Sequence, residues 1–251
     1  MEVHHHSQTL DPASHRGRKK WTHLLWEFLM LFLAVSLGFF VENQREHYVE
    51  HQREKQYMQS MIEDLKSDTA QFATNSNLRQ NRIEKIDSLI FLLGYADYKA
   101  NGNAIYYFAR SISPPLNFFP NDRTIQQLKS SGGLRLIRKV AVSNNIMAYD
   151  QKMRFFLFEL TDEIEVRSEY RQLARDVFDG KIFNSMLENN IVKRPLNNPA
   201  LFKADATLIN ALIGEAQYIK KIDLNQKSRT EELKKQATEL IEMIKNEYSL
   251  K

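Results

Sequence analysis

The sequence predicts an all-α protein in which one transmembrane helix continues into a long stem and an antiparallel helical bundle. An apolar run near the N-terminus is long enough to cross a bilayer. The rest of the chain has few glycines and prolines, 8 and 6 in total, and many Leu, Ile, Lys, Glu and Gln residues. Such a composition is typical of long helices, because these side chains lose little conformational freedom in a helix.

Residues 24–41 form the predicted transmembrane helix. With residues 21–23 as an interfacial collar, the apolar run reaches about 20 residues, which is roughly 30 Å of helix. Residues 16–20 before it are basic without an acid nearby, whereas the basic residues after it are diluted by glutamates. By the positive-inside rule, residues 1–23 are a basic cytoplasmic tail and residues 42–251 are periplasmic, so we expect a bacterial inner-membrane protein.

A cleaved signal peptide is the main alternative for this segment. A basic stretch precedes the apolar run, and Ala34, Val35 and Ser36 include the small residues that signal peptidase prefers. The run nevertheless continues for five residues beyond Ser36, which is longer than the apolar region of a usual signal peptide. A buried helix of a soluble protein is a weaker alternative.

Past the membrane, the apolar pattern predicts a stem and then a long helix. Residues 42–57 are polar and lack an apolar stripe, so they form the predicted stem. Apolar residues recur every three or four positions from Met58 to Phe72, lapse at residues 74–77, and resume from Ile83 to Leu93. We therefore expect one helix, or two collinear helices, up to residue 94, and a short helix over 104–112 after a turn.

Two loops interrupt the remaining helices. Residues 113–121 contain three prolines and cannot be helical, and we expect their two phenylalanines to insert into the core. A helix capped by Asn121 or Asp122 ends at residues 130–133, where a glycine supplies a left-handed C-cap. Helix resumes over 134–178, residues 189–204 form the second loop, and Asp205 caps a final helix that ends near residue 248. No strand pattern persists beyond a few residues, so the helices are expected to form an antiparallel bundle.

Residue content also restricts the chemistry. All 7 histidines lie within the first 51 residues, so the predicted bundle cannot assemble a Ser-His or Cys-His catalytic pair. The chain has no cysteine, phosphate-binding glycine loop or zinc-protease motif. Its 35 basic and 31 acidic residues are scattered, which argues against a nucleic-acid partner. The sequence predicts neither an enzyme nor a cofactor.

The sequence predicts no metal site, although histidines are grouped at two places. His47 and His51 lie four residues apart on one helix face and could chelate zinc, but no third ligand accompanies them, so a solvated stem is the simpler interpretation. The three histidines at residues 4–6 form a terminal stretch that is not interpreted as functional.

Glu27 is the candidate assembly residue of the membrane helix. A carboxylate within an apolar span costs a few kcal/mol and usually faces a partner, a cavity or a proton pathway. Because Glu27 lies only three residues into the run, the simpler alternative is that it reaches the headgroups or pairs with Lys20 or His23. Ser36 and Gly38 permit close helix approach without forming a G-x-x-x-G motif.

Two sequence segments resemble an uncharacterised family of bacterial single-pass membrane proteins. Trp26-Glu-Phe, the apolar run and Val41-Glu-Asn-Gln44 are similar to the family's membrane helix, which begins with a Glu and ends in an Asn-containing polar collar. Residues 124–137 are similar to its helix, Leu-Lys-x-Ser-Gly turn and following helix. Arg45 and Glu46 depart from the family's aromatic stretch at the collar. The resemblance implies membrane anchorage and a helical extracytoplasmic domain, and it implies no activity.

Three functions follow as hypotheses. The favoured one is a membrane-anchored interaction or scaffold protein that binds a protein partner, or itself, through its helical domain. The alternative is an extracytoplasmic ligand-binding, sensor-like bundle that signals through a partner subunit, because the tail is too short to be an output domain. The third, an enzyme with a carboxylate-only site, is disfavoured by the histidine distribution. The candidate ligand or partner surface consists of Tyr106, Tyr107, Phe118 and Phe119, although aromatic residues beside a Pro-rich loop are more often core residues.

Overall fold

The structure is a computed structural model that describes residues 16–250, with side chains described from residue 21 onward. Most of the predicted tail, including the histidines at residues 4–6, lies outside the described residues. The chain divides into two units between Arg53 and Glu54, and each is considered by itself. Both units are helical, in agreement with the predicted fold class.

The first unit consists of the N-terminal part of helix α1 (Arg16–Gly94). Among the described residues, this helix alone contains a segment long and apolar enough to cross a membrane, and none of that segment is buried within the chain. The large apolar side chains between residues 21 and 41 are 40–80% exposed. An apolar surface of this extent is unfavourable in water and is suited to a lipid environment.

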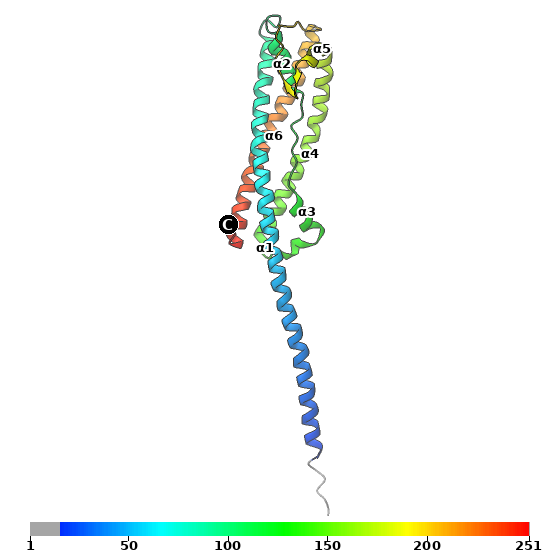
Figure 1. Cartoon of the computed structure of the whole chain (residues 1–251), viewed down its shortest axis with the longest axis vertical. Helices are drawn as coiled ribbons and strands as arrows, with labels where there is room; N and C mark the ends of the chain where they lie inside the picture. The colour runs from blue at the N-terminus through cyan, green and yellow to red at the C-terminus, as the bar shows by residue number, and fades with distance from the viewer. Residues whose placement is uncertain (1–15, 251) are drawn as a thin grey trace, which may run out of the picture. The chain divides into compact units, whose positions relative to one another are not determined.

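The second unit, residues 54–251, contains the remainder of α1 and all other elements. In chain order these are α2 (Gly102–Ile112), α3 (Arg123–Ser130), the 3₁₀ helix η1 (Gly133–Leu136), α4 (Val140–Val177), α5 (Gly180–Ser185), β1 (Leu187–Glu188), β2 (Ile191–Val192) and α6 (Ala206–Tyr248). Figure 1 shows the later part of α1 beside α4 and α6, with the short elements around them.

Local sequence signals explain most of the helix ends. The carboxylate of Asp205 accepts hydrogen bonds from the backbone N–H groups of Thr207 and Leu208, which confirms it as the N-cap of α6. Gly132 has φ of +67°, as expected for the glycine after α3. Asp122 occupies the predicted N-cap position of α3, but its side chain makes no capping hydrogen bond. Asp64 of α1 instead accepts from the backbone N–H of Thr124 at 3.0 Å.

Two further differences from the sequence prediction have physical causes. The helix expected from residue 134 begins at Val140, because the backbone N–H of Arg138 donates to the carboxylate of Glu54 on α1, at 2.7 Å, in place of a helical acceptor. Strands β1 and β2, which were not predicted, form an antiparallel hairpin. Its turn residues Asn189 and Asn190 have φ of 49° and 62°, a conformation that asparagine tolerates better than most residues.

Two hydrophobic clusters form the core of this unit. In the first cluster, residues 58–72 of α1 pack against the early part of α4 and the late part of α6. In the second, residues 86–93 of α1 pack against α2, the late part of α4 and the early part of α6. On each long helix, the stretch between its two apolar sections carries buried polar and charged side chains. These buried polar and charged side chains therefore lie between the two hydrophobic clusters.

Phe72 is central to the first cluster. It is fully buried, its ring stacks on that of Phe118 with centroids 4.7 Å apart, and it meets the ring of Phe156 edge to face at 6.2 Å. We expect Phe72→Ala to lower the free energy of unfolding by about 3–5 kcal/mol, since the cavity cannot fill completely. Denaturant titration of the full chain in detergent, followed by circular dichroism, measures this loss.

Phe158→Ala is the matched control, because this side chain is 66% exposed. It should change the free energy of unfolding by about 0.5 kcal/mol or less. Equal effects of the two substitutions would contradict the assignment of Phe72 to the core.

Candidate functional site

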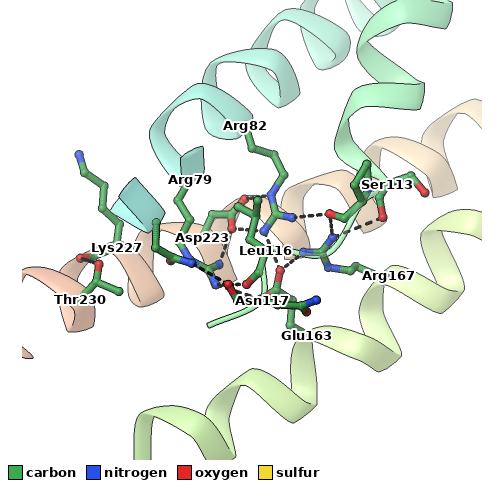
Figure 2. Close-up of polar contacts among 12 residues, drawn as sticks. Arg79, Arg82, Ser113, Leu116, Asn117, Glu163, Arg167, Asp223, Lys227 and Thr230 are labelled. Atoms are coloured by element: carbon green, nitrogen blue, oxygen red, sulfur yellow. Dashed lines mark hydrogen bonds and ion pairs between the residues drawn. The ribbon is translucent and has the colours of Figure 1, made fainter. Parts of the chain in front are cut away.

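Five charged side chains from three helices meet between the two hydrophobic clusters. They are contributed by α1, α4 and α6, and we call them the arginine cluster: Arg79, Arg82, Glu163, Arg167 and Asp223. None of these side chains is more than 5% exposed. Figure 2 shows them converging from the three helices.

Each arginine of the cluster bonds to at least one carboxylate. The guanidinium of Arg79 donates to Asp223 at 2.7 Å and to Glu163 at 3.2 Å. Arg82 lies between the same two acids, with its Nη2 atom 2.6 Å from Glu163 and its Nε atom 2.5 Å from Asp223. Arg167 donates to Glu163, which lies four residues earlier on α4. Glu163 and Asp223 therefore tie α4 and α6 to α1.

The remaining arginine N–H groups hold the Pro-rich loop, residues 113–121, which we call the strap. Arg82 donates to the carbonyl of Pro114 at 3.1 Å, and Arg167 donates to the carbonyls of Ser113 and Pro114. Arg79 reaches the carbonyl of Leu116 at 3.5 Å. Prolines lack a backbone N–H but retain the carbonyl, so a Pro-rich segment has more acceptors than donors. The arginines supply the missing donors (Figure 2).

The far end of the strap, at Asn121, is fixed by an acid of α1, Asp68. Asp68 accepts from the backbone N–H of Asn121 at 2.8 Å and from the hydroxyl of Tyr149 at 2.8 Å. Between the two attachments, Phe118 enters the first hydrophobic cluster. The strap is thus held at both ends and in the middle.

The cluster has an excess of positive charge. Its three guanidinium groups against two carboxylates give a formal net charge of +1. Burial raises the pKa of Glu163, but Arg79, Arg82 and Arg167 outweigh burial and lower it to about 2. Burial and the neighbouring Arg82 lower the pKa of Arg167, even though Glu163 opposes them. Arg167 is accordingly the least compensated member, and its Nε atom is buried without a hydrogen-bond partner.

A groove of about 480 Å³ lies between the strap and α4. Arg167 and Glu163 border it on the inside, and Phe119 and Ile164 at its rim are 72% and 65% exposed. The residues that line it are Pro115, Leu116, Asn117, Phe118, Phe119, Leu157, Leu160, Thr161, Glu163, Ile164, Arg167 and Arg171. We call it the strap groove.

A larger groove of about 680 Å³ between α4 and α6 is a weaker candidate. Its charged side chains are already paired: Lys152 with Glu232 at 2.7 Å, and Arg154 with Asp150 at 3.0 Å. Arg229 lies over the ring of Phe155 at 5.6 Å. A ligand there would have to compete with these contacts.

The predicted surface residues do not line one common site. Tyr106 is fully buried, and its hydroxyl donates to the carbonyl of Ala200 at 3.1 Å. The cations of Lys85 and Arg194 each lie over the ring of Tyr107, 5.7 and 5.1 Å from its centre. Both tyrosines belong to or pack against the second hydrophobic cluster.

Phe118 and Phe119 differ from each other. Phe118 lies in the core, as expected, whereas the expectation that Phe119 is also inserted was wrong. In an extended segment, consecutive side chains point to opposite sides, so only one of the pair can be buried. Phe119 therefore lies at the strap groove.

Glu27 and His47, the candidate polar residues of the first unit, each lie near an oppositely charged or titratable side chain of the same helix. Glu27 is 62% exposed, and its carboxylate lies 3.1 Å from Nδ1 of His23, one turn earlier. His47 lies 3.9 Å from Glu50. Among residues 16–250, no group of three or more His, Asp or Glu side chains is arranged to hold a metal ion.

Comparison with known proteins adds no assignment. No family model, curated protein or solved structure matches the chain.

The ionisation of the Glu163 carboxylate makes the free energy of unfolding depend on pH in the acid range. Its folded pKa, about 2, lies below its ordinary value of 4.5, so only the unfolded chain takes up this proton as the pH falls below about 5. Stability from this group is present above that pH and is lost as the pH falls toward 2. We expect Glu163→Gln to reduce the slope of the free energy of unfolding against pH below about pH 5, by up to about 1.4 kcal/mol per pH unit.

Equilibrium unfolding in detergent at several pH values between 2 and 6 measures this slope. Glu239→Gln serves as the control, because Glu239 is 65% exposed and lies outside the cluster. An unchanged slope in Glu163→Gln would show that the three arginines do not keep this carboxylate ionised.

Proposed function

We propose that this chain is a single-pass protein of the bacterial inner membrane that binds another protein through the strap groove. In this proposal residues 1–23 are cytoplasmic and the helical domain lies in the periplasm. The later part of α1, α4 and α6 form its antiparallel bundle. The basic stretch at residues 16–20 before the apolar segment supports the orientation, and the apolar segment, none of which is buried within the chain, supports the anchor.

The exposed apolar rim of the strap groove carries the proposal. Phe119 and Ile164 present large apolar side chains to solvent on either side of a concave surface. Apolar and aromatic side chains gathered around a concavity are typical of protein-binding surfaces, where a few such residues supply most of the affinity. An isolated exposed residue would carry no such meaning, but these two border the same groove.

The way the strap is held also favours binding. The arginine cluster and Asp68 fix the strap before any partner arrives. A rigid binding surface loses little conformational entropy on association, so more of the contact energy appears as affinity. By contrast, Tyr106 and Phe118 are core residues, which disfavours an enclosed ligand cavity built from the four predicted aromatic residues.

Site-specific photo-crosslinking in intact membranes tests the proposal. A photoreactive phenylalanine analogue is placed at Phe119 in one variant and at Ile164 in another. Both should yield an adduct with the same partner, because the two positions border one groove. Adding Leu160→Glu to the Phe119 variant should abolish the adduct, since a charge would then occupy the apolar wall.

Tyr218 of α6 is the control position, because it is 63% exposed and lies outside the groove. Crosslinking at Tyr218 should give no such adduct. The absence of an adduct at both rim positions, or an equal adduct at Tyr218, would overturn the proposal. An adduct with the mass of two copies of this chain would show that the groove binds a second copy of the chain and not another protein.

A further inference from the structure

We propose that the partner segment held by the strap groove carries apolar side chains followed by at least one carboxylate. This inference rests on the proposed function and specifies the chemistry of the partner. Its basis is the order of residues along α4 and the charge that lies behind the groove.

One face of α4 changes from apolar to basic along its length. The positions recur at spacings of three and four, which places them on a single stripe: Leu157, Leu160, Ile164, Ser168, Arg171 and Arg175. Leu157, Leu160, Ile164 and Arg171 line the groove directly. No acidic residue occupies this stripe, and the strap opposite it contains no charged residue. A segment bound along α4 would therefore contact apolar side chains near Leu157 and Ile164 and cations near Arg171.

The cations at the basic end are available to a partner. Arg171 and Arg175 are exposed, and neither makes an ion pair or hydrogen bond with the part of the chain that the structure describes. This contrasts with the larger groove between α4 and α6, where Lys152 and Arg154 are both paired with acids. Of these two grooves, the strap groove is the one that offers a cation without an acidic partner.

The arginine cluster adds to the attraction for a carboxylate. Its formal charge of +1 is buried, and Arg167 links it to the groove wall one helical turn before Arg171. A charge in a low-dielectric interior acts over a longer range than one in water, and the two arginines that line the groove, Arg167 and Arg171, outnumber its one carboxylate, Glu163. A carboxylate bound by Arg171 would partly balance that charge without displacing Glu163.

The probe for the test is a fluorescent peptide, Leu-Leu-Phe-Gly-Glu-Glu, compared with its uncharged counterpart Leu-Leu-Phe-Gly-Gln-Gln. The full chain is placed in nanodiscs of zwitterionic lipid, and binding is measured by fluorescence anisotropy. We expect the acidic peptide to bind about fivefold more tightly or better at low salt. Arg171→Gln should remove most of this preference, whereas the control Arg135→Gln, an exposed arginine outside the groove, should keep it.

Phe119→Ala should weaken both peptides equally and leave their ratio unchanged. Equal binding of the two peptides with the same dependence on Phe119 would overturn the carboxylate preference and leave the protein-binding groove intact. A preference that survives Arg171→Gln, or failure of both peptides to bind, would also overturn the inference. Failure of the proposed function itself is recognised separately, by the absence of crosslinks at Phe119 and Ile164.

Discussion

The helical domain depends on the compensation of charges that are buried together. Arg79 and Arg82 of α1 are held inside the protein by one carboxylate from α4 and one from α6. Removing either acid would leave an uncompensated guanidinium in the interior, which typically costs about 3–5 kcal/mol. Because ion pairs have directional partners, the cluster also specifies how the three helices align, which apolar contacts alone specify less well.

The same arginines connect this alignment to the surface. A segment with three prolines cannot satisfy its carbonyls within a helix, and the guanidinium groups provide donors that the strap itself lacks. Once its carbonyls point inward, the strap must direct alternate side chains inward and outward. Phe118 then stacks on Phe72, and Phe119 is left at the rim of the strap groove.

Apolar periodicity was sufficient to predict helices α1, α2, α3, α4 and α6, and the three prolines were sufficient to predict the loop that forms the strap. Helix α5 was not predicted. The arginine cluster was missed, although it left a signal. The seam on α1 lapses at residues 74–77, and Asn75, Arg79 and Arg82 continue the same spacing of three and four up to Ile86. Asp223 similarly falls in register with apolar positions of α6. Charged residues normally indicate a solvated face, and only the tertiary packing of three helices reveals that these are partners.

The buried arginines hold the strap in place. Hydrogen–deuterium exchange of the strap amides in Arg82→Met tests this role most directly, with Arg154→Met as the control because Arg154 is 64% exposed and pairs with Asp150 outside the cluster. The account predicts at least about tenfold faster exchange over residues 113–119 in Arg82→Met, by local opening that leaves α2 protected. Exchange that rises equally throughout the domain, or an unchanged strap, would show that the arginines stabilise the helices without positioning the binding surface.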